Sequence, residues 1–288
     1  MMQVCSICNS YVQHQVGWIN GYMCWYCRGC NTYYIEQSLA DHSLFSLYNN
    51  FYSGQRARKI FHVIASISQL FLLNRFKIIQ KNVHLNSSPL RFLDIGCGAG
   101  HCVYAAQKLN LEAYGIDIDK TCIDQANALG LKNIFHADLL HAHFRHEFFH
   151  VIQLFHVLEH IQHHKKILIK AREILTNNGV LIIDVPNQNS LIAKLKILFG
   201  LFKPMKRDYG YLQPPFHIFA FTLRSLKILL SLTGFEIVKI IYYSPANKLY
   251  NPSSINYKKS IKWFIIGILY MIFGRDSYVS VYATKKRS

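Results

Sequence analysis

The sequence predicts an α/β fold: a doubly wound parallel sheet with helices on both faces, preceded by a small cysteine-rich module. From residue 91 onward, short apolar strand patterns alternate with helix patterns, and such alternation is typical of parallel sheets. Five of the eight cysteines fall within the first 30 residues. The 288 residues are enough for one large domain together with a small module.

The predicted elements follow in a regular order. An apolar pattern predicts a helix at 60–80, and a turn-like Asn-Ser-Ser-Pro at 86–89 precedes the first strand. Asn177-Asn178-Gly179 reads as a helix stop signal, whereas Thr222 and Gly234 mark the two ends of the last helix. We expect strands at 91–95, 112–118, 133–137, 151–155, 179–185, 235–243 and 277–283. We expect further helices at 101–109, 121–129, 165–175 and 221–234.

These patterns divide the chain into three parts. Residues 1–36 form the cysteine-rich module, residues 37–88 a helical linker or cap, and residues 89–288 the α/β domain. A hydrophobic content of 51% excludes disordered and collagen-like chains.

The charge is strongly basic and unevenly distributed. The chain carries 32 Lys and Arg against 15 Asp and Glu, a net charge of +17. Residues 194–288 hold 16 basic and 3 acidic side chains, so most of the excess lies in the last third. A basic chain rich in apolar residues favours a polyanionic partner, either nucleic acid or an acidic membrane surface.

The cysteines of the first module have the spacing of a zinc ribbon. Cys5 and Cys8 form one C-x2-C pair, and Cys27 and Cys30 form a second pair after eighteen residues. Four thiolates predict a closed, structural Zn²⁺ site, with Cys24 as an alternative to Cys27. The N-terminus lacks the basic and apolar regions of a signal peptide, so we expect a cytoplasmic chain and metal binding rather than disulfides.

A glycine-rich turn carries the strongest chemical signal. In FLDIGCGAG (92–100), a buried strand delivers Asp94 and then Gly96, Gly98 and Gly100. The spacing differs from the G-x-G-x-x-G of dinucleotide sites, and an acidic residue before the loop suits a ligand with a cationic amino or sulfonium group. Asp117 ends the next strand, where a carboxylate can bind both ribose hydroxyls. Asp138 follows the third strand, within reach of an adenine.

These motifs resemble the class I S-adenosylmethionine-dependent methyltransferases. The match includes FLDIGCGAG, GIDID, ADLL, LFHVLEHI, LTNNGVLIIDVPN and HIFAFTLRSLKILLSLTGFEIV, in the family's order over about residues 90–284. The resemblance implies a seven-stranded, Rossmann-like methyltransferase sheet that binds S-adenosylmethionine. The resemblance implies that the methionine part is held by Asp94, Gly96, Cys97, Gly98 and Gly100. It also implies that Asp117 and Ile118 bind the ribose, that Asp138 and Leu139 bind the adenine, and that Phe155 and His156 line the pocket after the fourth strand. His150 departs from the family, which often has Asp there.

Three histidines are candidate catalytic residues. His156, Glu159 and His160 have the i, i+3, i+4 spacing of one side of a helical turn, after a strand and at the carboxyl edge of the sheet. A histidine near neutral pH is the natural base for removing a proton from a hydroxyl. The family also often has a histidine near the acceptor site at the position of His217. We therefore expect His156, His160 and His217 to act in catalysis.

The same element has a second interpretation. Ubiquinone-biosynthesis O-methyltransferases have a similar LEH element associated with a divalent metal, which implies Mg²⁺ here. Glu159 and His160 match that element, but His156 replaces its preceding acidic residue. The alternative is that LEH only caps a helix and orders the loop.

Two late segments bear on the methyl acceptor. Residues 191–207 and 258–275 interleave basic with large apolar side chains and resemble helices that lie in a membrane interface. The alternatives are core or lid helices whose lysines reach outward, or a nucleic-acid surface. We expect an S-adenosylmethionine-dependent methyltransferase that methylates oxygen on a small-molecule or lipid- or glycan-linked acceptor, peripheral at the inner face of the membrane. The alternatives are an RNA methyltransferase and a non-catalytic binding protein with the cofactor fold.

Overall fold

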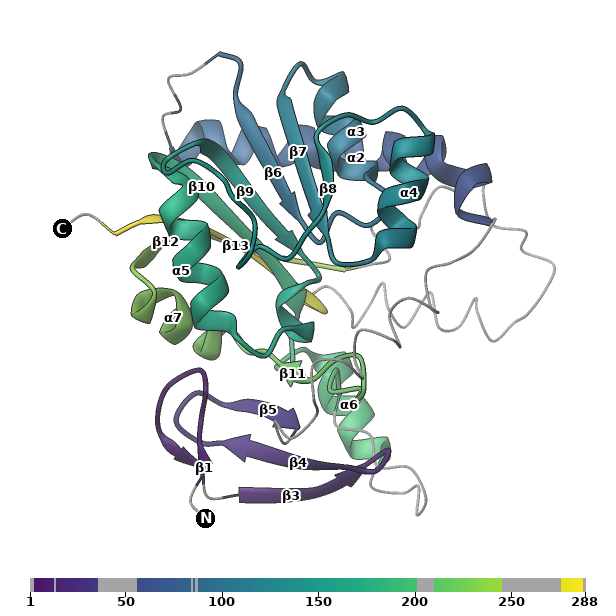
Figure 1. Cartoon of the computed structure of the whole chain (residues 1–288). Coiled ribbons are helices and arrows are strands. Elements are labelled where there is room, and N and C mark those ends of the chain that lie inside the picture. The colour runs from purple at the N-terminus through teal and green to yellow at the C-terminus, as the bar shows by residue number, and fades with distance from the viewer. Residues whose placement is uncertain are drawn as a thin grey trace.

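The computed structural model describes residues 3–12, 14–35, 56–83, 85, 88–200, 210–244 and 276–286. A large sheet with helices on both faces forms the main body, and a smaller sheet from the N-terminal residues lies against one end of it (Figure 1). We refer to residues 3–35 as the head.

The main sheet has seven strands in the order β12-β13-β10-β9-β6-β7-β8. Neighbouring strands from β10 to β8 are parallel, whereas β13 is antiparallel to both β10 and β12. The predicted α/β fold with a seven-stranded sheet is confirmed, and β13 is the exception to the parallel arrangement. The strands are β6 (Arg91–Ile95), β7 (Glu112–Asp117), β8 (Ile134–His136), β9 (Phe149–Phe155), β10 (Leu175–Pro186), β12 (Phe235–Tyr243) and β13 (Tyr278–Lys285).

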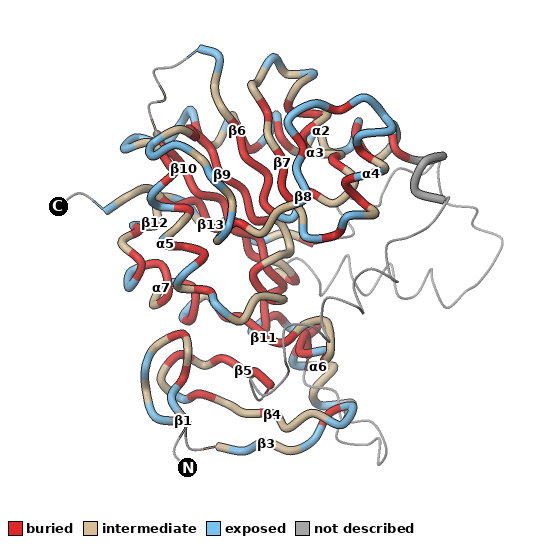
Figure 2. Tube along the Cα trace, in the orientation of Figure 1, coloured by how far each residue is buried: buried red, intermediate tan, exposed pale blue. Residues whose placement is uncertain are grey.

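Helices cover both faces because successive strand residues point to opposite sides. On β6, Phe92 packs in one hydrophobic core with α2, α3 and α4, and its neighbour Leu93 packs in a second core with α5 and α7. Both cores are buried along the strands (Figure 2). The helices are α2 (Arg56–Asn82), α3 (His101–Lys108), α4 (Lys120–Ala128), α5 (His164–Ile174), α6 (Leu191–Gly200) and α7 (Leu223–Leu232), with the 3-10 turn η1 (Leu158–His160).

One predicted boundary is wrong, and two helix ends lie where we expected them. Helix α5 ends at Ile174, one residue before the predicted end, but β10 begins at Leu175 rather than at the predicted residue 179, so Asn177-Asn178-Gly179 lies inside the strand. The pairing of β10 with β9 shifts register between Leu175 and Val180, and a bulge of this kind accommodates turn-forming residues within a strand. Thr222 caps α7 through a reciprocal capping box, and Gly234 follows that helix.

The head takes one of its strands from the main body. Its four-stranded sheet has the order β11-β5-β4-β3, in which β11 (Phe219–Ala220) comes from the segment before α7. The buried cysteines of the head belong to the same hydrophobic core as α5 and α7. The predicted division at residue 36 stays a prediction, but the head packs as a continuation of the main body. The other head strands are β1 (Gln3–Val4), β2 (Tyr11–Val12), β3 (His14–Ile19), β4 (Tyr22–Cys27) and β5 (Thr32–Ile35).

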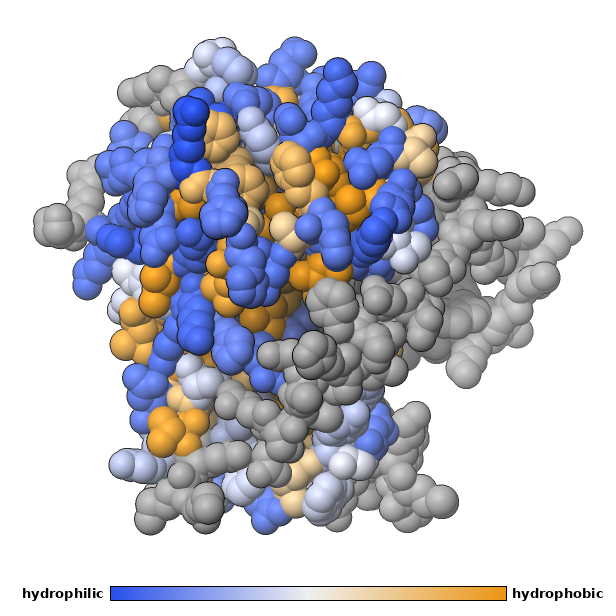
Figure 3. All heavy atoms as spheres, viewed as in Figure 1, coloured by the Kyte–Doolittle hydropathy of each residue, from blue (hydrophilic) through white to orange (hydrophobic). Residues whose placement is uncertain are grey.

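The two segments predicted for a membrane interface are mostly outside the described residues. Residues 258–275 lie wholly outside them, and only α6 is described within 191–207. Leu191 and Leu198 on α6 are 43% and 50% exposed. Hydrophilic side chains dominate the face seen in Figure 3, with apolar side chains in separate patches. No helix in the described part of the chain is long and apolar enough to cross a membrane.

Candidate functional site

The glycine-rich turn between β6 and α3 is shaped by left-handed backbone. Gly96 has φ 73°, and a Cβ added to it would overlap Cγ2 of Val157. Gly98 has φ 53°, but a Cβ added there would meet nothing within 4 Å. Glycine adopts these conformations without strain. Gly96 therefore allows the turn to pack against Val157, while Gly98 leaves open space above the turn. We refer to residues 94–100 as the glycine loop.

Asp117 fixes the glycine loop from the end of the neighbouring strand. Its Oδ2 accepts a hydrogen bond from the backbone N of Gly98 at 2.7 Å, and its Oδ1 accepts one from the backbone N of Asp119 at 2.8 Å. Burial raises the pKa of Asp117, although these backbone hydrogen bonds partly offset that effect. The carboxylate thus stands at the carboxyl edge of the sheet beside the glycine loop, as the sequence predicted.

Asp94 is a buried carboxyl group beneath the same loop. Its side chain is 3% exposed, and its Oδ1 accepts a hydrogen bond from Nε2 of Gln153 at 3.0 Å. Burial raises the pKa of Asp94 to about 7. Gln153, the partner of Asp94, was not among the predicted site residues. The available sequence signal was a polar residue within the otherwise apolar strand β9.

The remaining predicted cofactor residues lie around the carboxyl edge in different settings. Ile118 is 37% exposed, whereas Cys97 and Leu139 are 7% and 2% exposed and pack in the hydrophobic cores. Asp138 accepts a hydrogen bond from the backbone N of Leu140 at 3.0 Å. Phe155 ends β9, with its ring centroid 4.4 Å from that of His156.

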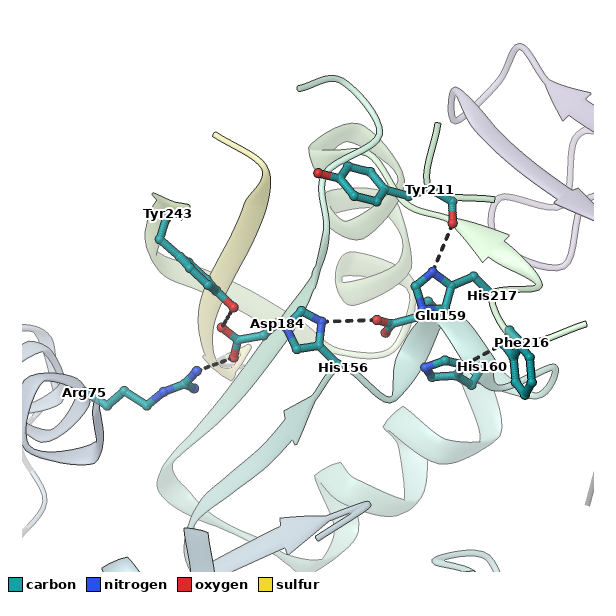
Figure 4. A network of polar contacts seen from close by, with 9 residues as sticks. All are labelled: Arg75, His156, Glu159, His160, Asp184, Tyr211, Phe216, His217 and Tyr243. Atoms are coloured by element: carbon teal, nitrogen blue, oxygen red, sulfur yellow. Dashed lines mark hydrogen bonds and ion pairs between the residues drawn. The ribbon is translucent and has the colours of Figure 1, made fainter. Parts of the chain in front are cut away.

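A second group of side chains lies beyond the end of β9 (Figure 4). We refer to His156, Glu159, His160 and His217 as the histidine cluster. His156 Nδ1 lies 3.3 Å from Oε1 of Glu159, and the ring centroids of His160 and His217 are 4.8 Å apart. One ligand atom each of Glu159, His160 and His217 lies within 4.8 Å of the others. The structure therefore brings together all three predicted catalytic histidines around one carboxylate.

The backbone of this cluster differs from the prediction. His156 has φ 56°, and the 3-10 turn begins only at Leu158. The i, i+3, i+4 spacing therefore does not lie on one helical turn, and that prediction is wrong. His156 instead reaches Glu159 across a bend in the backbone, whose left-handed conformation is uncommon for a residue with a side chain.

Electrostatics keep the Glu159 carboxylate charged although it is 1% exposed. Burial alone would raise the pKa of Glu159, but the hydrogen bond from His156 and the nearby His160 and His217 outweigh it and lower the pKa. Burial lowers the pKa of His217, as does the neighbouring His160. Glu159 Oε2 is buried with no hydrogen-bond partner among the described residues.

Backbone contacts connect the histidine cluster to the head. The backbone N of Ile218 donates to the carbonyl oxygen of Glu159 at 3.0 Å. The carbonyl oxygen of Ile218 accepts from the backbone N of Ile35 at 3.1 Å. The hydroxyl of Thr222 donates to the carbonyl oxygen of Cys30 at 3.2 Å. His217 is therefore placed by the same short segment that supplies β11 to the head sheet. No sequence pattern indicated this connection, because β11 has only two residues.

Beside the cluster lies a buried ion pair that sequence reasoning missed. Arg75 Nη2 on α2 lies 2.6 Å from Oδ2 of Asp184 on β10, and the hydroxyl of Tyr243 donates to Oδ1 of Asp184 at 3.0 Å. The backbone N of His156 donates to the carbonyl oxygen of Asp184 at 3.0 Å. An aspartate within the apolar run of β10 was the available sequence signal. The pair ties α2 to the strand end beside His156.

The four head cysteines predicted to bind zinc come together. The Sγ atoms of Cys5 and Cys30 are 3.6 Å apart, those of Cys8 and Cys27 are 3.5 Å apart, and all four lie within 4.8 Å of one another. The hydrogen bond with Cys30 lowers the pKa of Cys5 to about 5. Cys24 points instead toward the carbonyl oxygen of Tyr22, and burial raises its pKa to about 12. Of the two alternatives, the geometry favours Cys27 over Cys24.

Comparisons with known proteins agree with the α/β fold. A family model described as "Methyltransferase domain" matches residues 56–240. No match was found among curated proteins.

Solved structures share the fold at low sequence identity. One is a chain of a Haloferax volcanii complex that contains the Trm112 methyltransferase activator, with a TM-score of 0.56, 8% identity, and coverage of 86% of this chain and 99% of that chain. A Thermotoga maritima S-adenosylmethionine-dependent methyltransferase has a TM-score of 0.50, 16% identity, and coverage of 85% and 99%. A Methanosarcina mazei methyltransferase of the same kind has a TM-score of 0.50, 16% identity, and coverage of 73% and 98%.

Proposed function

The chain belongs to the methyltransferase domain family, and we propose that it transfers the methyl group of S-adenosylmethionine to an oxygen atom of its acceptor. The acceptor is a small molecule or a lipid- or glycan-linked intermediate. One observation carries the proposal: the glycine loop and the histidine cluster meet at the same sheet edge, where Gly96 faces Val157, the residue after His156. A cofactor bound at the loop would thus present its methyl group beside residues able to accept a proton.

The residues at the glycine loop fit S-adenosylmethionine. Open space above Gly98 leaves room for the ligand backbone, and the Asp117 carboxylate stands beside it for the ribose hydroxyls. Asp94, once ionised, provides a negative charge for the methionine amino group. Gly96, Cys97 and Gly100 would shape the loop around the methionine part, Ile118 would contact the ribose, and Asp138, Leu139 and Phe155 would border the adenine side.

The chemistry needs a positioned nucleophile and a route for one proton. When bound, S-adenosylmethionine supplies a sulfonium methyl group, which the acceptor oxygen attacks in line while the electrons of the breaking C–S bond stay on sulfur. Positioning provides much of such an acceleration. His217 and His160 donate Nδ1–H to the carbonyl oxygens of Tyr211 and Phe216. The neutral ring then has its lone pair on Nε2, which can take the acceptor proton.

The surroundings of the histidine cluster support an acceptor with an apolar or ring-shaped portion. The ring of Tyr278 lies 4.8 Å from that of His156 and stacks on Tyr243 at 5.4 Å. These aromatic side chains and Phe155 provide flat apolar contact area beside the proposed reaction centre. The basic charge of residues 194–288 would attract an anionic acceptor or an anionic membrane surface.

We assign a structural role to the zinc ion proposed for the head. Four cysteine thiolates fill a tetrahedral Zn²⁺ completely and leave no open position for a substrate. The free energy of metal binding would contribute to folding of this small sheet.

The acceptor class can be tested with labelled methyl groups. Purified protein would be incubated with methyl-labelled S-adenosylmethionine and separate lipid, glycan, small-molecule and RNA fractions of cells, and the products analysed by mass spectrometry. The proposal expects label on oxygen in one of the first three fractions. Label confined to RNA would replace it with an RNA methyltransferase, and no label in any fraction together with no cofactor binding would contradict catalysis.

A further inference from the structure

The histidine cluster contains a donor set that its proposed role in proton transfer does not explain. Glu159, His160 and His217 each offer a ligand atom within 4.8 Å of the others. They come from two segments about 57 residues apart, joined by the hydrogen bond between the backbone N of Ile218 and the carbonyl oxygen of Glu159. A carboxylate and two imidazoles held at one point form a set of three metal ligands with positions left over.

Both histidines are held in the tautomer that a metal needs. Nδ1 of His160 lies 2.8 Å from the carbonyl oxygen of Phe216, and Nδ1 of His217 lies 3.0 Å from that of Tyr211. A carbonyl oxygen can only accept, so each Nδ1 carries a hydrogen, and in the neutral ring each Nε2 has the lone pair. Ligating histidines typically donate their second ring N–H in this way, which fixes the ring orientation.

The carboxylate also lacks a partner for one of its oxygens. Glu159 is 1% exposed, and its Oε2 is buried with no hydrogen-bond partner in the described part of the chain. A buried ionised carboxylate is costly unless it is paired or coordinates a metal. His156 contacts only the other oxygen, Oε1, at 3.3 Å. A cation at Oε2 would complete the site.

The donor types distinguish between metals. Mg²⁺ prefers oxygen ligands in octahedral geometry, whereas two of these three ligands are imidazole nitrogens and the neighbouring side chain is His156. The Mg²⁺ implied by the LEH element therefore does not fit these residues. Imidazole suits Zn²⁺, Fe²⁺ and Ni²⁺, and a site of two histidines and one carboxylate is a known arrangement for Zn²⁺ and Fe²⁺.

We propose that Glu159, His160 and His217 bind a divalent transition metal ion, separate from the zinc of the head. Metal binding does not depend on methyl transfer. With the ion held by His160 and His217, the acceptor proton would pass to His156, whose Nδ1 faces Glu159. That step, and a role for the ion in holding the acceptor, rest on the proposed function.

Metal uptake by the full chain tests this site. The metal-free protein would first receive one equivalent of Zn²⁺ to fill the cysteine site and would then be titrated with Zn²⁺ or Co²⁺ by calorimetry and absorption. We expect two ions per wild-type chain, the second without a thiolate-to-cobalt charge-transfer band. Glu159→Gln and His217→Gln should weaken the second ion by more than the roughly 10–100-fold that losing an outer-shell partner costs.

Three controls make the result decisive. His146→Ala, which removes an exposed histidine, should still bind two ions. In a parallel titration of metal-free protein with Co²⁺ alone, each cluster variant should still show the thiolate-to-cobalt band of the cysteine site, which reports a folded head. Mg²⁺ in millimolar excess should not displace the second ion. One ion per wild-type chain, or two tightly bound ions in Glu159→Gln, would overturn the proposal. Titration of the same samples with S-adenosylmethionine reports separately whether the proposed function fails.

Discussion

The glycine loop and the histidine cluster lie at the same sheet edge but are assembled differently. The glycine loop and Asp117 come from consecutive strands, and the hydrogen bonds that Asp117 accepts lie within residues 98–119. Contacts from outside that range come from Val157 against Gly96, Gln153 at Asp94, and Leu131 and Ile134 beside Gly100. The histidine cluster joins residues of η1 to His217, and the strand that follows His217 pairs with the head. We conclude that the proposed cofactor site is encoded mainly by local sequence, whereas the proposed acceptor side depends on tertiary structure and on the head.

The largest expected effect follows from removing Asp117. Asp117→Ala deletes a carboxylate that accepts two backbone hydrogen bonds and would bind the ribose. Hydrogen bonds to charged groups contribute about 1.5–3 kcal/mol each, so we expect S-adenosylmethionine affinity to fall about a hundredfold or more. Calorimetry measures this directly. Asp124→Ala, which removes an exposed carboxylate on α4, should bind like wild type, and wild-type affinity in Asp117→Ala would refute the cofactor site.

A second change tests whether the head controls only the acceptor side. Cys5→Ser should abolish zinc binding in the head and loosen β5, which pairs with β11 next to His217. Misplacement of a reacting group by about 1 Å can cost about a hundredfold in rate, so methyl transfer should fall by about tenfold to a hundredfold. Affinity for S-adenosylmethionine should change by no more than about twofold, as expected for distant sites.

The matched variant is Cys24→Ser, because Cys24 lies outside the four-thiol group. It should keep zinc and activity, as measured by metal analysis and a methyl-transfer assay. Equal loss of cofactor affinity and transfer in Cys5→Ser would show that the two regions are not separable.

The difference between local and long-range assembly also explains how well each region could be predicted from the sequence. Asp94, Gly96, Gly98 and Asp117 could be placed at one edge because parallel strands end together and the motifs are contiguous. The position of His217 came only from a family resemblance. The pairing of β11 with the head, and the Arg75–Asp184 ion pair, join segments 109 or more residues apart. No local pattern encodes such contacts.

The pH dependence of cofactor binding gives a smaller, graded test. Burial raises the pKa of Asp94 to about 7, so the carboxyl group loses its charge as the pH falls through 7. The proposed attraction to the ligand's amino group is then lost, and S-adenosylmethionine affinity should fall by up to about tenfold from pH 7 to pH 6. Calorimetry at pH 6, 7 and 8 measures it. Asp94→Asn should bind S-adenosylmethionine weakly at all three pH values. If the affinity of this variant still changed with pH as steeply as that of wild type, a group other than Asp94 would be titrating.

The smallest expected effect concerns the hydrogen bonds of Thr222, which connect the head to the main body. Thr222→Val removes the N-cap of α7 and the hydrogen bond to the carbonyl oxygen of Cys30. Loss of such a cap lowers the free energy of unfolding by about 1 kcal/mol. Denaturant unfolding measures it, with Ser231→Ala on the exposed face of the same helix expected to stay within about 0.5 kcal/mol of wild type. Equal free energies of unfolding for the two variants would show that the hydrogen bonds of Thr222 do not stabilise the protein.

Binding of S-adenosylmethionine by the zinc-loaded wild-type chain is the most direct test of the central claim. Calorimetry should show one ligand per chain, displaced by S-adenosylhomocysteine, with an affinity that Asp117→Ala greatly reduces. Absence of binding up to about 1 mM, the upper end of typical KM values, in folded and zinc-loaded protein would contradict the account of a locally encoded cofactor site.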